Sequence, residues 1–117
     1  MSYAAVLGYR RSRRNFLGMQ ARVVTIRDGE LRVVDRAGEV NERVAVADTR
    51  ATLKRGMVEV TAGDRSFFLF GYPAINKVPR ELLERMEAAD VMPEPGESAF
   101  KVSRQFLEVM QEHGARP

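Results

Sequence analysis

Four arginines lie within five positions near the start of the chain, between the aromatic residues Tyr9 and Phe16. A guanidinium group donates several hydrogen bonds in a planar fork that matches a phosphate or a carboxylate. Basic residues interleaved with aromatic ones can bind a nucleic acid or an anionic membrane surface. They can equally pair with acidic side chains of the same domain or of a neighbouring molecule. The candidates for binding an anion or a partner are Arg10, Arg11, Arg13 and Arg14, to which Lys54 and Arg55 are added.

The residue types that carry most enzyme chemistry are scarce. The chain has no cysteine and one histidine, His113, which excludes thiolate chemistry and a histidine metal cluster. Serine nucleophiles need a basic partner, and no histidine of the predicted core supplies one. Glu81, Glu84 and Glu87 could hold a cation, but arginines lie between and beside them, as on a solvated helix face. We therefore expect no enzyme, no metal site and no cofactor.

Composition and charge describe a single domain with two oppositely charged halves. The 117 residues are 44% hydrophobic and 30% charged, which suits one packed domain. Residues 1–55 hold 12 Lys or Arg and 6 Asp or Glu, whereas residues 56–117 hold 7 and 10. This split favours either contact between copies of the chain or a separate partner for the basic half.

Residues 12–17 resemble a twin-arginine export motif. Such a signal is followed by an apolar stretch of about 7–15 residues, but here Gly18–Arg22 follows, and then a charged strand. No apolar run approaches the roughly 20 residues that span a bilayer. We therefore expect a cytoplasmic protein, which could work at the inner surface of the membrane.

From Gln20 onward, apolar residues alternate with polar ones, which is the pattern of β-strands. Asp28-Gly29 separates two such runs and predicts a tight hairpin, because both central residues of a type I′ turn need positive φ. That turn places Arg27 opposite Glu30 and so sets the register. Turn signals recur about every 8–12 residues, which is typical of an antiparallel sandwich or barrel. The predicted strands are Gln20–Arg27, Glu30–Arg36, Val40–Val46, Asp48–Lys54, Met57–Thr61 and Ser66–Gly71.

Three details of this region are also expected. In the third strand, Val44 and Val46 point into the core. The apolar run Phe67–Phe70 predicts a strand that is buried on both faces or covered by a helix on its outer side. Upstream of the strands, Tyr3–Leu7 forms one or two helical turns.

The last third of the chain has the periodicity of helices. Residues 79–90 place apolar side chains on one arc and glutamates on the other. Ser98 is a good N-cap for a second helix over 98–112. The apolar arc of this second helix covers about half of its circumference, which is wider than one flat contact needs. It is therefore expected to close a concave surface or to contact a second body as well. The interface candidates on this arc are Phe100, Phe106, Leu107 and Met110.

This order of elements resembles the pleckstrin-homology-like (PH-like) superfold, most of all its small bacterial and GRAM-type members. The resemblance implies an α+β fold, in which an antiparallel β-barrel or sandwich of six to seven short strands precedes two C-terminal helices, the last of them capping the barrel. The PH-like domain would span residues 20–117, after a basic N-terminal segment over 1–19. The residues that carry the resemblance are Val24–Asp35, Asp35–Val40, Val44–Val46, Gly56–Val60 and Arg65–Gly71.

Members of this superfold are binding modules, which use the open end of the barrel or its edge strands. Those that bind phosphoinositides carry a basic cluster around the first hairpin loop, whereas the first loop expected here, Arg27–Glu30, is short and half acidic. The resemblance implies a non-enzymatic module for protein–protein interaction or self-association. The alternative is peripheral binding to an acidic membrane or a nucleic acid through the basic N-terminal segment. Sequence-specific nucleic-acid recognition is disfavoured, because no reading helix or stacking platform is evident. The third hypothesis is a small enzyme or ligand carrier with its site in the barrel mouth.

Overall fold

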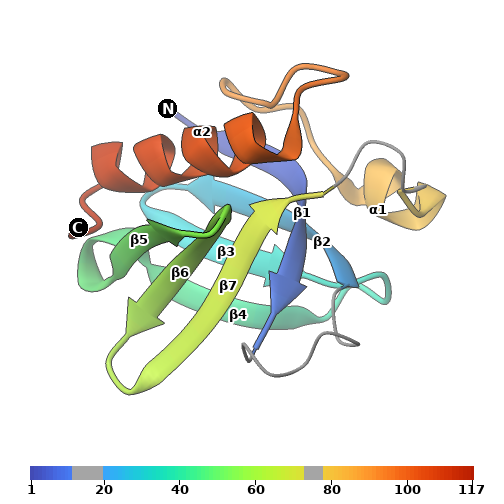
Figure 1. The fold of residues 1–117 in the computed structure, drawn as a ribbon. Helices are drawn as coiled ribbons and strands as arrows, with labels where there is room; N and C mark the ends of the chain where they lie inside the picture. The colour runs from blue at the N-terminus through green and yellow to red at the C-terminus, as the bar shows by residue number, and fades with distance from the viewer. Residues whose placement is uncertain (12–19, 73–77) are drawn as a thin grey trace.

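The computed structural model of the protein describes residues 1–11, 20–72 and 78–117. The described strands form one antiparallel sheet of seven, in the order β4-β3-β2-β1-β7-β6-β5, and two helices follow them, as predicted for an α+β fold (Figure 1). The strands are β1 (Tyr3–Arg10), β2 (Gln20–Arg27), β3 (Glu30–Val34), β4 (Val40–Ala45), β5 (Arg50–Lys54), β6 (Met57–Ala62) and β7 (Arg65–Gly71). The helices are α1 (Arg80–Arg85) and α2 (Ala99–Glu112), and a short 3-10 turn, η2 (Val46–Asp48), joins β4 to β5.

The β2–β3 hairpin has the predicted turn and register. Asp28 and Gly29 both adopt positive φ, at 52° and 74°, and Arg27 pairs with Glu30. The ends of the other strands between residues 20 and 71 agree with the prediction to within two residues. Short turns between alternating runs are a local signal, and they locate the strands that they join.

The N-terminal segment departs most from the prediction. Tyr3–Arg10 is not helical at its start; it forms β1, between β2 and β7 at the centre of the sheet. Gly8 is required in this strand, because the ring of Phe70 lies where a Cβ atom would be. Residues 3–10 therefore belong to the same sheet as the strands between residues 20 and 71. The first hairpin of the sheet joins β1 to β2 through residues 11–19, and Arg27–Glu30 is the turn of the second hairpin rather than the first.

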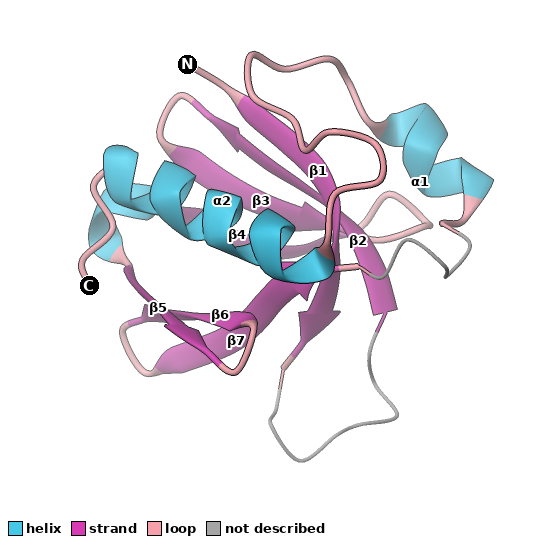
Figure 2. Ribbon diagram, turned by 45° about the horizontal axis from the view of Figure 1, so that its top comes forward, coloured by secondary structure: helices cyan, strands magenta, loops and turns pink. Residues whose placement is uncertain are grey.

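The sheet does not close into the expected barrel. β4 and β5 are its two edges, and they do not pair with each other. The inner face of the sheet instead encloses one apolar core, and α2 lies across this face, packed against β5, β6 and β7 (Figure 2). Phe106 of α2 is fully buried and lies against Tyr3 of β1, with 5.7 Å between the ring centroids.

α1 is shorter than the helix that was predicted over 79–90. It ends at Arg85, and the chain then runs beside the start of β1, where the amide of Val91 donates to the carbonyl of Ser2 over 2.9 Å. Met86 already has an extended backbone, with φ −80° and ψ 115°, and so ends the helix. Leu82, which is fully buried, holds α1 against the outer face of β2.

The two edges of the sheet differ. C-terminal residues form hydrogen bonds along the free side of β5. The amide of Ala51 donates to the carbonyl of Arg116 (2.8 Å), and the amide of Arg116 donates to the carbonyl of Thr49 (2.9 Å). In the described part of the chain, no segment pairs with the free side of β4. β4 instead carries a buried carboxylate, that of Glu42. A charge on the inner face of an edge strand discourages pairing with another chain.

Candidate anion-binding site

A polar cluster lies at the end of β1 opposite to the Tyr3–Phe106 contact. Its centre is the carboxylate of Glu42, a residue that is only 4% exposed. The hydroxyl of Tyr9 donates to Glu42 Oε2 over 2.6 Å, and Arg65 Nη2 donates to Glu42 Oε1. Arg11 Nε lies 3.7 Å from Glu42 Oε2 and donates to the Tyr9 hydroxyl over 3.3 Å. We call Tyr9, Arg11, Glu42 and Arg65 the Glu42 cluster.

The strands place these side chains on the inner side of the sheet. Tyr9 is the last inward residue of β1 and packs against Phe67, with 6.1 Å between the ring centroids. Glu42 lies on β4 opposite Val33, a core residue, and so points inward. Arg65 begins β7 directly after the β6–β7 turn. The Glu42 cluster therefore ties an edge strand to β1 and β7, which lie beyond β3 and β2 in the sheet.

Arg22 of β2 lies beside the Glu42 cluster. Its guanidinium carbon is 5.4 Å from the centre of the Tyr9 ring, a distance at which a cation is attracted to an aromatic face. Arg22 Nε also donates to Asn41 Oδ1 over 2.6 Å. Asn41 is the extra residue of a β-bulge, since Val33 pairs with Glu42 whereas Val34 pairs with Val40. The bulge thus brings a second β4 side chain to this end of the sheet.

The Glu42 cluster holds two arginines and one glutamate, so its net charge is positive. Burial, together with the hydrogen bond to Glu42, raises the pKa of Tyr9 to about 12, so the phenol remains protonated and donates. Two guanidinium groups, those of Arg11 and Arg65, lie around the carboxylate of Glu42, whereas Arg22 lies beside the Tyr9 ring and interacts with the carboxylate of Asp35. The side chains of Arg11 and Arg65 are 72% and 60% exposed. Because one carboxylate neutralises one guanidinium, the exposed N–H groups can donate to an external phosphate or carboxylate.

The structure separates the basic candidates. Arg11 belongs to the Glu42 cluster, whereas Arg10 is 7% exposed and directs Nη1 to Met57 Sδ at 3.9 Å. Burial removes Arg10 from any surface that an anion could reach. Arg13 and Arg14 lie outside the described residues.

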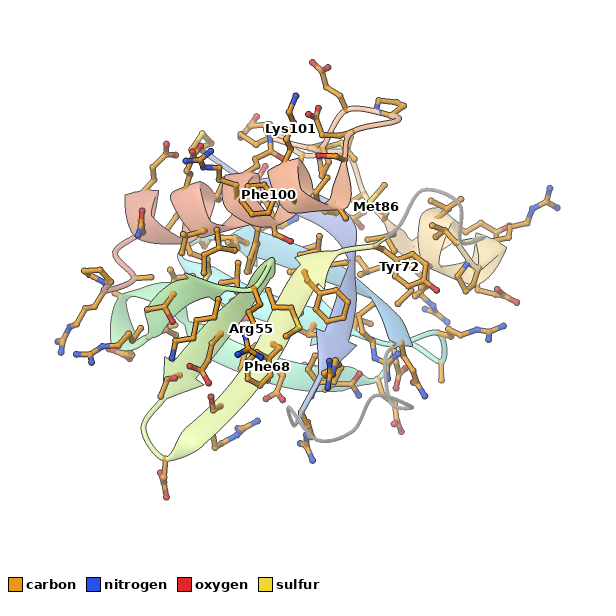
Figure 3. All side chains as sticks on the ribbon, viewed as in Figure 1. Arg55, Phe68, Tyr72, Met86, Phe100 and Lys101 are labelled. Carbon is orange, nitrogen blue, oxygen red and sulfur yellow. The ribbon has the colours of Figure 1, made fainter. Side chains whose placement is uncertain are left out.

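Lys54 and Arg55 lie at the β5–β6 turn, and neither is a member of the Glu42 cluster; Figure 3 labels Arg55. Lys54 Nζ lies 3.3 Å from Glu59 Oε1. Arg55 adopts positive φ, 52°, in the turn. Lys54 and Arg55 therefore stay candidates for binding an anion, at a place separate from the contacts of the Glu42 cluster.

The interface candidates of α2 are mostly inside the molecule. Phe106 and Met110 are fully buried in the core, and Leu107 is partly buried and packs against it. Only Phe100 among the four is exposed, at 53%, on the first turn of α2 (Figure 3). The wide apolar arc of this helix is therefore used within the domain.

A groove of about 900 Å³ lies between α1 and the outer face of the β2–β3 hairpin. It was not predicted, because α1 and the hairpin are distant in sequence. Both signs of charge line it, so it shows no preference for an anion or a cation. No group of acidic and histidine side chains suited to a metal ion occurs among the described residues. The charged residues of the groove are Arg27, Asp28, Glu30, Arg32, Glu84, Arg85 and Glu87.

Sequence reasoning found Arg11 but missed the rest of the Glu42 cluster as a site. One signal was present: Glu42 has the same parity as Val44 and Val46, the residues predicted to point inward. A carboxylate on the inner face of a strand needs a buried partner. Arg65 could not have been named as that partner without the order of the strands.

No protein-family model matches the chain, and no curated protein matches it. In the part of the chain that the structure describes, there is no helix both long enough and apolar enough to cross a membrane. The function is therefore argued from the chemistry of the Glu42 cluster and its neighbours.

Proposed function

We propose that this protein is a non-enzymatic binding module that contacts an acidic membrane surface through the end of the sheet that carries the Glu42 cluster. The seven-stranded antiparallel sheet and the C-terminal helix across it support a PH-like relationship. The first β1–β2 connection, residues 11–19, begins with Arg11 and includes Arg13 and Arg14. In the PH-like superfold, members that bind phosphoinositides carry a basic cluster around the loop of the first hairpin, and the β1–β2 connection is that loop here. The proposed place of action is the cytoplasmic face of the membrane.

The observation that carries this proposal is the pair of exposed guanidinium groups around one buried carboxylate. Arg11 directly follows β1 and Arg65 begins β7, yet both are directed to Glu42. Their position is therefore set by the fold, which lowers the entropy that binding would cost. Each basic residue near an acidic leaflet contributes about 1 kcal/mol, so a group of three to five supports reversible binding.

Flotation with vesicles that contain phosphatidylserine tests this proposal. The wild-type protein is expected to float with acidic vesicles at low salt, and raising the salt should release it, because screening weakens the attraction. Replacing Arg11 and Arg65 together with alanine should lower the affinity about 30-fold, since each lost charge is worth about fivefold. Arg104→Ala, which removes an exposed charge from α2, is the matched control and should leave the affinity within about twofold.

Three results would contradict a membrane role. The first is no flotation at low salt, and the second is equal loss in the double variant and the Arg104→Ala control. The third is binding to duplex DNA at a salt concentration that abolishes flotation, which would assign the same arginines to a nucleic acid.

Self-association or contact with another protein is the second candidate, and Phe100 favours it. This aromatic side chain is 53% exposed on α2, and the two halves of the sequence carry opposite net charge. Light scattering at increasing concentration should then show a dimer or a larger species. Phe100→Ser should return it to the monomer without lowering the stability. A wild-type protein that is monomeric throughout, and a Phe100→Ser variant that behaves identically, would exclude self-association.

A further inference from the structure

Glu42 is the carboxylate to which both arginines of the Glu42 cluster are directed. Its two oxygens already accept from Arg65 and Tyr9, and Arg11 lies 3.7 Å away. We propose that Glu42 is an internal counter-charge, which competes with external anions for Arg11 and Arg65 and so limits the affinity of this end of the sheet. The inference rests on the proposed function, because it concerns the regulation of the same site.

The two arginines are held unequally by Glu42. Arg65 makes a direct hydrogen bond to Oε1, whereas Arg11 lies beyond hydrogen-bond distance of Oε2 and bonds the Tyr9 hydroxyl instead. Arg11 is also the more exposed of the two. An arriving anion is therefore expected to contact Arg11 first. It gains Arg65 only by sharing or replacing the bond to Glu42.

The burial of Glu42 gives the competition its strength. The carboxylate is 4% exposed, so solvent screens it less than it screens the two arginines. Its hydrogen bond from Tyr9 further fixes it in place, because the phenol is buried beside Phe67. An anion cannot displace Glu42 into solvent without disturbing β4. The carboxylate therefore stays near the arginines when an anion arrives and opposes it.

Glu42→Gln tests this inference, because the amide keeps an acceptor for Tyr9 or Arg65 and loses the charge. The affinity for phosphatidylserine vesicles is expected to rise about fivefold, the value of one elementary charge near an acidic leaflet. Its salt dependence should steepen at the same time. Glu59→Gln is the matched control, since Glu59 is also paired with a basic residue, Lys54, on a strand of the same sheet. Glu59 pairs with Lys54 rather than with Arg11 or Arg65, so its effect on an anion held by those two arginines should be much smaller.

The outcomes separate the inference from the proposed function. If wild-type protein binds and Glu42→Gln binds no more tightly, or no more tightly than Glu59→Gln, the inference is wrong and the membrane role stands. If the wild type does not bind but Glu42→Gln does, Glu42 masks the site, as proposed. If neither protein binds, the proposed function fails and the inference fails with it.

A measurement on the wild-type protein covers the case in which Glu42→Gln does not fold. Carboxylate carbons can be followed by NMR during a titration with inorganic pyrophosphate. The Cδ signal of Glu42 and the Nε signals of Arg11 and Arg65 should move together, while the Cδ signal of Glu59 stays fixed. Movement of the arginine signals with no change at Glu42 would overturn the inference.

Discussion

β1 carries a tyrosine near each of its ends, and the two phenol groups are buried in opposite ways. Tyr3 is fully buried against Phe106, and its hydroxyl has no hydrogen-bond partner among the described residues. Tyr9 is 6% exposed, and its hydroxyl donates to Glu42. The α2 end of the core is thus held by apolar packing and the other end by charges and hydrogen bonds. The first arrangement excludes water from the contact, whereas the second leaves two exposed arginines at its rim.

The largest effect is expected at the apolar end. Phe106→Ala removes a fully buried ring and should lower the free energy of unfolding by about 3–5 kcal/mol, which urea denaturation would measure. Phe100→Ala is the matched control on the same helix, and it should cost less than about 0.5 kcal/mol, because that ring is largely exposed. Equal losses in the two variants would show that α2 does not cover the core.

A smaller loss is expected at the polar end. Glu42→Ala leaves the Tyr9 hydroxyl and Arg65 without their acceptor, which should lower the free energy of unfolding by about 1–3 kcal/mol. The arginine is well exposed and can turn to water, so the cost comes mainly from the buried phenol. An unchanged urea midpoint would mean that the Glu42 cluster contributes no stability.

The two tyrosines offer the most direct comparison of the ends. Tyr9→Phe removes a hydroxyl that is bonded to a carboxylate, and should destabilise by about 1–2 kcal/mol. Tyr3→Phe removes a buried hydroxyl that lacks a described partner, and should leave the stability unchanged or slightly higher. Thermal unfolding of both variants beside the wild type would decide. A larger loss for Tyr3→Phe than for Tyr9→Phe would reverse the assignment of the ends.

The smallest effect is expected from alkaline pH. Burial and Glu42 raise the pKa of Tyr9 from 10.0 to about 12, so the unfolded chain loses this proton before the folded protein does. The stability from this group is complete below pH 10 and falls as the pH rises toward 12. Between pH 9.5 and 10.5 the loss should stay below about 1 kcal/mol.

The same pH range gives a matched comparison between variants. Tyr9→Phe should show a shallower decline of the urea midpoint than the wild type. Some decline should remain, because burial also raises the pKa of Tyr3. Parallel declines in the two proteins would show that Tyr9 titrates equally in the folded and unfolded states.

The parts of the fold that follow from local chemistry were predictable. Asp28-Gly29 determines its own turn and therefore the register of β2 and β3. β1 was missed because the residues from Tyr3 to Leu7 are all apolar and arginines follow from Arg10 onward. The segment therefore lacks the alternation of polar and apolar residues that is typical of a strand. Its place between β2 and β7 depends on pairing between distant segments. The residues adjacent to β1 in the sequence do not indicate that pairing.

The candidate site was predictable only in its charge. Arg11 lies in a visible basic run, but the position of Arg65 beside Glu42 follows from the order of the strands. The path of the chain after α1 has the same kind of cause, since Val91 pairs with the start of β1. Contacts between segments that are distant in sequence determine the place of β1, the position of Arg65 and the path of the chain after α1. The periodicity of the sequence does not indicate such contacts.

The central place of β1 has a consequence for how the chain acquires its shape during synthesis. β1 is made before the other described strands and can pair with β2 soon afterwards, but its second neighbour is β7, where Leu7 pairs with Gly71. Until Gly71 has been made, one edge of β1 has no strand to pair with. A nascent chain that ends at the η2 turn should therefore form only β1 to β4, with one edge of β1 exposed to chaperones. Synthesis of β7 should then cover that edge.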